Sequence, residues 1–246
     1  MKNLLLSIFT LLILISTKAQ QSGVVVYEQT MKMDLDLPPE FKDMVPKERK
    51  FKMQLLFNES ESIYKDMPEE EADVAEEIES SQGNMRFKFK MDRPKNETYK
   101  NLKDGVTVEK QSLMGRDFRI IGAPEKIQWK MGGEKKQIAG YLCIMATYMR
   151  DTIPVIAWFT PQIPVQNGPG TMGQLPGLIL ELDVNEGKQV TKAVSVDLRA
   201  LKEGEVITAP TKGKEIKREK FNKLREEKMK EMKEMGGGKR MMIRHG

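Results

Sequence analysis

Residues 172–183 read "MGQLPGLILELD" and combine a proline and two glycines with a strongly apolar run. The tetrapeptide at 175–178 fits a type II β-turn, in which proline fixes φ at the second position and glycine accepts a positive φ at the third. The residues that follow alternate between two faces as a strand over 178–184. A slip of one residue would exchange those faces, so the turn sets the strand's register. The stretch contains no nucleophile, phosphate-binding loop or pair of metal ligands, and this predicts a structural role.

Alternation of apolar and polar residues recurs along most of the chain and indicates strands with one buried face. The segments that show it, or that form an apolar run of strand length, are 22–33, 47–58, 84–92, 106–114, 117–122, 141–149, 154–160, 178–184 and 188–198. Turn signals lie at Asp104-Gly105, Gly132-Gly133, Asn167-Gly168-Pro169-Gly170 and Glu186-Gly187. Short strands joined by turns favour an antiparallel arrangement. We therefore expect a mainly β fold built on an antiparallel sheet.

The first residues, "MKNLLLSIFTLLILISTKA", have the pattern of a secretory signal. Lys2 supplies the positive start, an apolar core of a dozen residues follows, and small residues precede the expected cleavage after Ala19. The core is too short for a permanent membrane anchor, although an uncleaved anchor is the alternative. We expect residues 1–19 to be a signal peptide and the protein to be exported to the periplasm or beyond, with no integral membrane span after its removal.

Two segments depart from the strand pattern. Residues 66–82 hold eight acidic and no basic residues, and we interpret them as a solvated excursion from a β-rich domain over 20–211. The tail from 212 holds thirteen Lys or Arg against six Glu, and its apolar residues fall on one side of a helix. A basic amphipathic helix is expected over 212–235, from about Lys214 to Met235 and ended by glycines 236–238, with a flexible tail over 236–246. Within the helix, Phe221, Leu224, Met229, Met232 and Met235 form the apolar side.

The stretch "AWFTPQIPVQNGPGTMGQLPGLILEL" (157–182) resembles the signature of the GLPGLI family, exported proteins known mainly from Bacteroidetes, and "GYLCIMAT" (140–147) resembles the strand that precedes it. The resemblance implies an exported, mainly β protein without an established activity. A strongly curved antiparallel sheet, in the form of an open barrel or half-barrel, is expected by analogy with periplasmic lipoprotein carriers. Gln174 replaces the first glycine of the family name, which argues against a positive φ there. The signature residues to which we assign a structural role are Trp158, Phe159, Thr160, Pro161, Asn167, Gly168, Pro169, Leu175, Pro176, Gly177, Leu178 and Ile179.

Catalytic residues are not expected. The single histidine, His245, lies next to the C-terminus, where it cannot be held beside a nucleophile. The single cysteine, Cys143, alternates with apolar residues on an expected strand and is interpreted as a small buried side chain. The net charge of +5 is too small to favour nucleic acid as a partner. We expect no cofactor.

The sequence thus favours a non-enzymatic envelope protein that binds either a hydrophobic ligand in the concavity of the sheet or an envelope partner protein through its tail. A basic amphipathic helix could also lie on an anionic membrane. The alternative is the handling of copper or another soft metal, since thioethers and imidazole suit Cu(I). The residues that would serve it are Met229, Met232, Met235, Met241, Met242 and His245.

Overall fold

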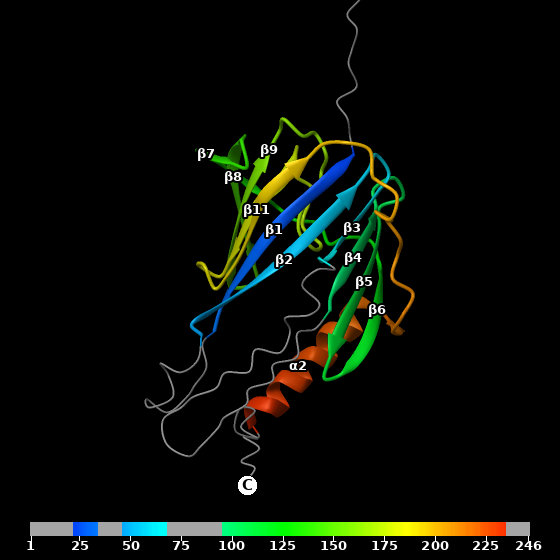
Figure 1. Cartoon of the computed structure of the whole chain (residues 1–246). Coiled ribbons are helices and arrows are strands. Elements are labelled where there is room, and N and C mark those ends of the chain that lie inside the picture. The colour runs from blue at the N-terminus through cyan, green and yellow to red at the C-terminus, as the bar shows by residue number, and fades with distance from the viewer. Residues whose placement is uncertain (1–21, 34–45, 68–94, 235–246) are drawn as a thin grey trace, which may run out of the picture.

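The computed structural model describes residues 22–33, 46–67 and 95–234 and shows one sheet of twelve strands with a helix near the C-terminus (Figure 1). The elements are β1 (Gly23–Lys32), β2 (Glu48–Phe57), β3 (Glu61–Asp66), β4 (Glu97–Asn101), β5 (Val106–Leu113), β6 (Arg116–Gly122), β7 (Lys130–Ile138), β8 (Tyr141–Arg150), β9 (Ile153–Thr160), β10 (Leu178–Val184), β11 (Gln189–Asp197), β12 (Lys214–Ile216) and α2 (Arg218–Glu234). Several predictions concern segments outside the described residues: the expected signal peptide over 1–19, nearly all of the acidic segment, and the tail 236–246 with the glycines expected to end the helix.

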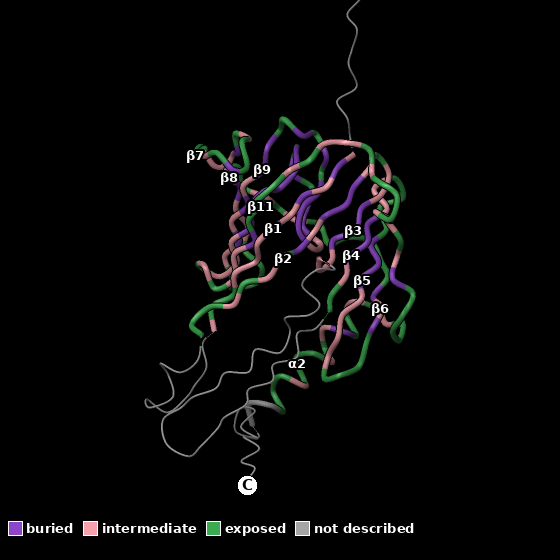
Figure 2. Tube along the Cα trace, in the orientation of Figure 1, coloured by how far each residue is buried: buried purple, intermediate pink, exposed green. Residues whose placement is uncertain are grey.

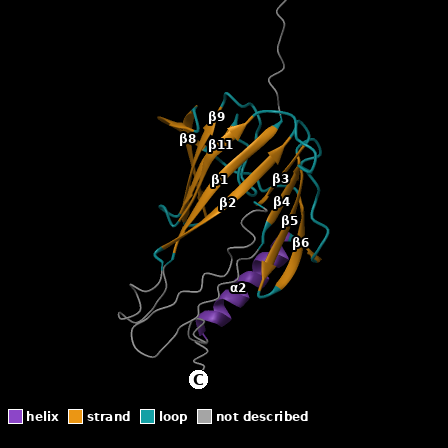
Figure 3. Ribbon diagram, in the orientation of Figure 1, coloured by secondary structure: helices purple, strands orange, loops and turns teal. Residues whose placement is uncertain are grey.

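The strand order is β12-β6-β5-β4-β3-β2-β1-β11-β10-β9-β8-β7. Among the described residues, neighbouring strands are antiparallel except for β12, which pairs in parallel with β6. The edge strands of the sheet are β12 and β7. The sheet is strongly curved and does not close (Figures 1 and 3). The expected fold class, a curved antiparallel sheet with a C-terminal helix, is confirmed, and the sheet is open and not a closed barrel.

Most of the expected strands are present within one or two residues of their predicted ends. The alternation over 84–92 lies outside the described residues. The structure corrects two other predictions. Gly132 and Gly133, expected in a turn, lie inside β7, where the register shifts between Met131 and Lys135 in a bulge that two glycines accommodate. Residues Lys214–Ile216, expected in the helix, form β12 against β6, so α2 begins only at Arg218.

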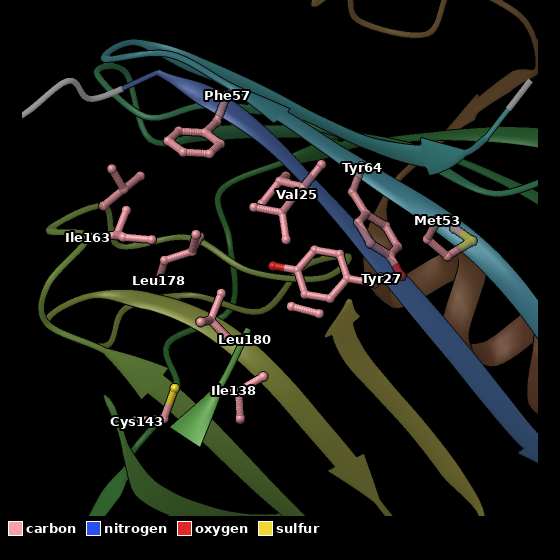
Figure 4. Close-up of a cluster of buried hydrophobic side chains, with 13 residues drawn as sticks. Val25, Tyr27, Met53, Phe57, Tyr64, Ile138, Cys143, Ile163, Leu178 and Leu180 are labelled. Carbon is pink, nitrogen blue, oxygen red and sulfur yellow. The ribbon is translucent and has the colours of Figure 1, made fainter. Parts of the chain in front are cut away.

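The core divides into clusters on the curved sheet. One joins β1 and β2 to β8 and β10 and includes Tyr27, Phe57, Cys143 and Leu178 (Figure 4). A second lies on β8–β10 and includes Ala157. Figure 2 shows this buried interior, while α2 is largely exposed. A third, small cluster forms where α2 packs on β6. No helix in the described part of the chain has the length and apolarity needed to cross a membrane.

Candidate functional site

Residues 161–177, here called the signature loop, connect β9 to β10 and lie against the sheet. Buried Ile163, Val165 and Asn167 alternate with exposed neighbours. The Leu178 N–H donates to the Ile163 carbonyl at 3.0 Å, and the Ile179 N–H donates to the Asn167 carbonyl at 2.9 Å. The loop is therefore held along the first residues of β10 by backbone hydrogen bonds, which satisfies groups that burial would otherwise leave unpaired.

The turn at Leu175-Pro176-Gly177 is not the expected type II turn. The Gly177 N–H donates to the Leu175 carbonyl at 2.7 Å, two residues back, which closes a γ-turn around Pro176. Gly177 has φ of 157°, far from the value near +80° that a type II turn requires. Glycine is needed for another reason: a Cβ there would lie 2.1 Å from the Thr160 carbonyl oxygen. The glycine allows the loop and the end of β9 to approach closely.

Gln174 also differs from expectation, because it has φ of 65° although it is not glycine. Its side chain compensates for this strained conformation. The Nε2 atom donates to the Glu125 carbonyl at 2.7 Å, and the Oε1 atom accepts from the Ile127 N–H at 3.2 Å. A positive φ at this position is therefore retained with glutamine in place of glycine, and the amide ties the loop to the segment before β7.

Lys100 of β4 makes polar contacts with the middle of the signature loop. Its side chain is 7% exposed, and its Nζ donates to Asn167 Oδ1 at 2.8 Å, to the Gly168 carbonyl at 3.3 Å and to the Met172 carbonyl at 2.5 Å. Burial lowers the pKa of Lys100 to about 7. All three protons of the ammonium have acceptors, so the geometry is that of a tether from β4 to the loop and leaves no proton directed toward a substrate.

Tyr27 of β1 makes a second tether. Its hydroxyl donates to the Ile179 carbonyl at 2.8 Å, at the place where the β9–β10 register shifts. Its ring is 0% exposed and packs edge-on against Tyr64. Burial raises the pKa of Tyr27 well above its ordinary value, so the hydroxyl stays a donor. Strands from the centre of the sheet thus fix both ends of the signature.

The structure brings together most of the signature residues that the sequence indicated. The buried ones are Phe159, Thr160, Asn167, Gly168, Pro169, Leu175, Gly177, Leu178 and Ile179. Trp158 is half-buried, with Lys136 Nζ 4.1 Å from its ring centroid, while Pro161 and Pro176 are exposed. Phe159, Leu175 and Ile179 share one apolar cluster, and Leu178 belongs to the other. They form a packed structure and line no polar cleft.

Cys143 is fully buried in the apolar cluster of Figure 4. Burial raises the pKa of its thiol to about 11, so the nucleophilic thiolate is suppressed. Lys136 and Glu181, joined at 2.6 Å, are the nearest charges that act on it. Over the described ranges, no group of three His, Cys, Asp or Glu side chains is placed to hold a metal ion.

The outer side of the signature loop meets a partly exposed cluster of aromatic and cationic side chains. Trp129 packs edge-on against Tyr148 with ring centroids 4.8 Å apart, and its Nε1 donates to the Gly173 carbonyl at 3.0 Å. Arg150 Nε donates to the Tyr148 hydroxyl at 3.0 Å, and Arg150 Nη2 lies 3.8 Å from Met172 Sδ. Met172 therefore belongs both to the buried tether and to this surface.

The helix is fixed to the sheet mainly near its start. Arg218 forms an ion pair with Glu109 of β5, a carboxylate that is 2% exposed and also accepts from Gln111 Nε2 at 2.7 Å. Phe221 packs edge-on against Phe118 at 5.6 Å. Leu224 contacts the same cluster, whereas Met229 is 50% exposed. The expected apolar stripe is thus used for docking at its first two positions, and the side chains of Met232 and Met235 lie outside the described residues.

Sequence reasoning missed Lys100, Tyr27 and Arg150, which make the polar contacts of this region. Lys100 stands in the strand "ETYKN", at a position whose direct partners are Ser62 and Thr107. A lysine between small polar partners gives no sign that it is buried. The turn sequence Asn167-Gly168-Pro169-Gly170 indicated a loop but did not show that carbonyl oxygens of the loop would accept from a lysine of a distant strand.

Comparison with known families agrees with this location. A family model described as "Protein of unknown function (Porph_ging)" matches residues 148–181, which begin at Tyr148 in β8 and end at Glu181 in β10. The match covers most of the GLPGLI-like signature, and the name GLPGLI itself stays a prediction. No curated protein matches the sequence.

A solved protein with a longer chain contains a similar fold. PNGF-II, solved in space groups P21 and C2, is similar with 16% sequence identity and a TM-score of 0.54 in both crystals. The similarity covers 83% and 82% of this chain but 33% and 32% of PNGF-II, so the chain spans about a third of that protein. An uncharacterised conserved protein from Thermus thermophilus has 7% identity and a TM-score of 0.39 over 82% of this chain and 93% of its own. The comparisons show a shared fold with PNGF-II and a matching family of unknown function.

Proposed function

We propose that this protein is an exported, non-enzymatic envelope protein that binds a partner protein through its C-terminal arm, β12 and α2. The observation that carries the proposal is the incomplete docking of α2. Beyond Leu224, residues 225–231 are exposed except for half-buried Lys228. Isolated helices of this length are marginal in water, and most helices are stabilised by packing of an apolar face. A partner would supply that packing for the distal turns.

The side chains on the exposed turns of α2 indicate what kind of surface the partner would present. Residues 218–234 hold seven basic and five acidic side chains. Among residues 218–231, whose side chains the structure describes, Met229 is an exposed apolar residue. A helix of this kind binds in a groove with an apolar socket and a mildly acidic rim. Methionine suits such a socket, because its side chain adapts to irregular surfaces.

The state of the buried titratable groups supports a non-enzymatic role. Glu109 is paired with Arg218, Glu181 is paired with Lys136, and Lys100 has three acceptors. The raised pKa of Cys143 disfavours a thiolate. In the residues that the structure describes, these groups serve packing, and none of them is arranged as a nucleophile beside a base.

The copper alternative stays a prediction, because Met241, Met242 and His245 lie outside the described residues. A competition titration for Cu(I) with the chain before and after removal of 236–246 tests it. Equal uptake by the two forms would exclude that role for the tail.

Site-specific crosslinking in the native envelope tests partner binding. A photoreactive amino acid at Met229 should give a discrete adduct of higher mass, while the same group at Val194, which is 53% exposed on β11, should give none. The adduct should disappear when Phe221→Ala releases the helix. No adduct at Met229, or the same adducts from both positions, would overturn the proposal.

A further inference from the structure

One side of β8–β10 is covered at one end and open at the other. At the covered end, Met172 and Leu175 of the signature loop pack with Phe159 and Ile179. Toward the other end of the same side, Tyr148 lies opposite Val155 and Arg150 lies opposite Ile153. Directly opposed residues of antiparallel strands lie on the same side of a sheet. The side therefore continues past the loop toward the β8–β9 hairpin.

The uncovered part is apolar. Ile153 is 37% exposed, and Met131, opposite Ala146, is 55% exposed. Tyr148 and Val184 are half-buried on the same side. We call Met131, Tyr148, Ile153 and Val184 the open strip. Four partly exposed apolar side chains on adjoining strands form a continuous surface that an apolar chain can cover.

Arg150 stands at the end of this strip with its charge uncompensated. Its contacts are the Tyr148 hydroxyl at 3.0 Å, the Tyr148 ring, whose centroid lies 5.9 Å from Cζ, and the thioether of Met172 at 3.8 Å, and sulfur is a weak acceptor. Arg119, Arg199 and Arg218 each pair with a carboxylate, but Arg150 pairs with none in the described part of the chain. These uncharged contacts hold the guanidinium in place without neutralising its charge, and its remaining N–H groups have no acceptor among the described residues.

We propose that the open strip and Arg150 bind a free long-chain carboxylic acid, with the alkyl chain on the strip and the carboxylate on the guanidinium. A planar guanidinium matches a carboxylate with two parallel hydrogen bonds. The apolar surface leads up to this single cation, so the ligand carries one anionic group at the end of an apolar chain. This site is separate from the C-terminal arm and does not depend on its proposed function.

Tryptophan fluorescence can report binding to the strip, because Trp129 contacts Tyr148 of the strip. The chain has one other tryptophan, Trp158, and replacing it leaves Trp129 as the single reporter. In the Trp158→Phe protein, Trp129 fluorescence reports titration with dodecanoate below its micelle concentration, and the methyl ester is the uncharged control. Arg150→Gln should weaken dodecanoate binding at least ~10-fold, since hydrogen bonds to a charged group are the stronger ones, and should leave the ester unchanged. Arg116→Gln, an exposed arginine of β6, is the matched control and should change neither.

Ile153→Glu should weaken binding of both ligands, because it places a charge in the strip. Urea unfolding of each variant shows that the fold is retained. Absence of saturable binding overturns the proposal, as does equal affinity of the Arg150→Gln and parent proteins for dodecanoate. Arg150-dependent binding to vesicles with anionic lipid, without binding of monomeric dodecanoate, would assign the strip to a membrane surface and overturn the free acid as its ligand.

Discussion

The signature loop and the C-terminal arm both cover apolar parts of the same sheet, and a basic side chain helps to hold each of them. In the loop, Lys100 extends from the sheet to three uncharged oxygens. In the arm, Arg218 extends from the helix to the buried carboxylate of Glu109. The loop is also held by backbone hydrogen bonds and by buried side chains along its length, whereas the arm depends mainly on Phe221 and its neighbours. The loop is therefore part of the core, and the arm is attached to it.

Stability should follow this difference. Segments with many buried contacts unfold only with the whole domain, while segments with few of them open locally. A change in the loop should lower the free energy of global unfolding. A change in the arm should release the helix and leave the sheet intact. The experiments below separate the two cases.

The largest effect is expected for Gly177→Ala. The new Cβ would lie 2.1 Å from the Thr160 carbonyl oxygen, and neither backbone segment can move without breaking strand contacts. We expect a loss of ~3 kcal/mol or more in the free energy of unfolding, measured by urea denaturation. Gly133→Ala in β7 is the control, because nothing lies within 4 Å of the point that its Cβ would occupy. Equal effects at the two glycines would show that the close approach does not matter.

Lys100→Met comes next. The thioether fills much of the space but removes the donor to the carbonyls of Gly168 and Met172. Asn167 Oδ1 loses one of its two donors and keeps the Gly168 N–H at 2.8 Å. Unpaired buried acceptors are costly, and we expect a loss of about 3 kcal/mol in global stability by urea denaturation. Lys103→Met changes an exposed lysine at the end of the same hairpin and should have little effect. A small loss at Lys100 would mean that the loop does not need its tether.

Phe221→Ala should act locally. The substitution removes the ring that packs against Phe118, at a cost of ~2–3 kcal/mol to docking of the arm. Hydrogen exchange of α2 amides should accelerate, while exchange in β1 and the midpoint of global unfolding should hardly change. Met229→Ala, at a position that is 50% exposed, is the control and should leave exchange near Phe221 unaltered. A global loss of stability would contradict the separation of arm and core.

The smallest effect concerns pH. Because burial lowers the pKa of Lys100 to about 7 from 10.5, the unfolded chain binds more protons than the folded one between these values. Stability should therefore rise with pH in that window, by about 1 kcal/mol between pH 7 and 8, where the Cys143 thiol of the unfolded chain is still mostly protonated. The rise should vanish in Lys100→Met. A flat profile in the parent protein would show that the three acceptors keep the ammonium charged.

Individual strands and residues show how much of the fold the sequence predicts. Alternation located β1 and β2, because a strand with one buried face must alternate. It missed β3 and β4, whose buried Ser62, Thr98 and Lys100 are polar and hide the pattern. It also placed a turn at Gly132-Gly133, since glycine marks turns and bulges alike. Local pattern is ambiguous wherever tertiary contacts satisfy a polar group or absorb an extra residue.

The signature illustrates the same limit. The sequence identified the residues around Pro176 and Gly177 as structural, and the structure buries most of them. The kind of turn was wrong, and so was the inference from Gln174. The sequence does not show that Thr160 lies against Gly177, or that the backbone around Glu125 binds the glutamine side chain. Both contacts join segments that are distant along the chain.

The sequence by itself determined the mainly β class, the antiparallel sheet and the C-terminal helix, because each depends on periodicity or on the backbone limits of proline and glycine. Only the tertiary structure decided that Lys100 and Tyr27 hold the signature loop, that β12 precedes the helix, and that Arg150 ends an open apolar strip. These features depend on which strands become neighbours, and in a sheet where β1 pairs with β11 that choice is made by long-range packing.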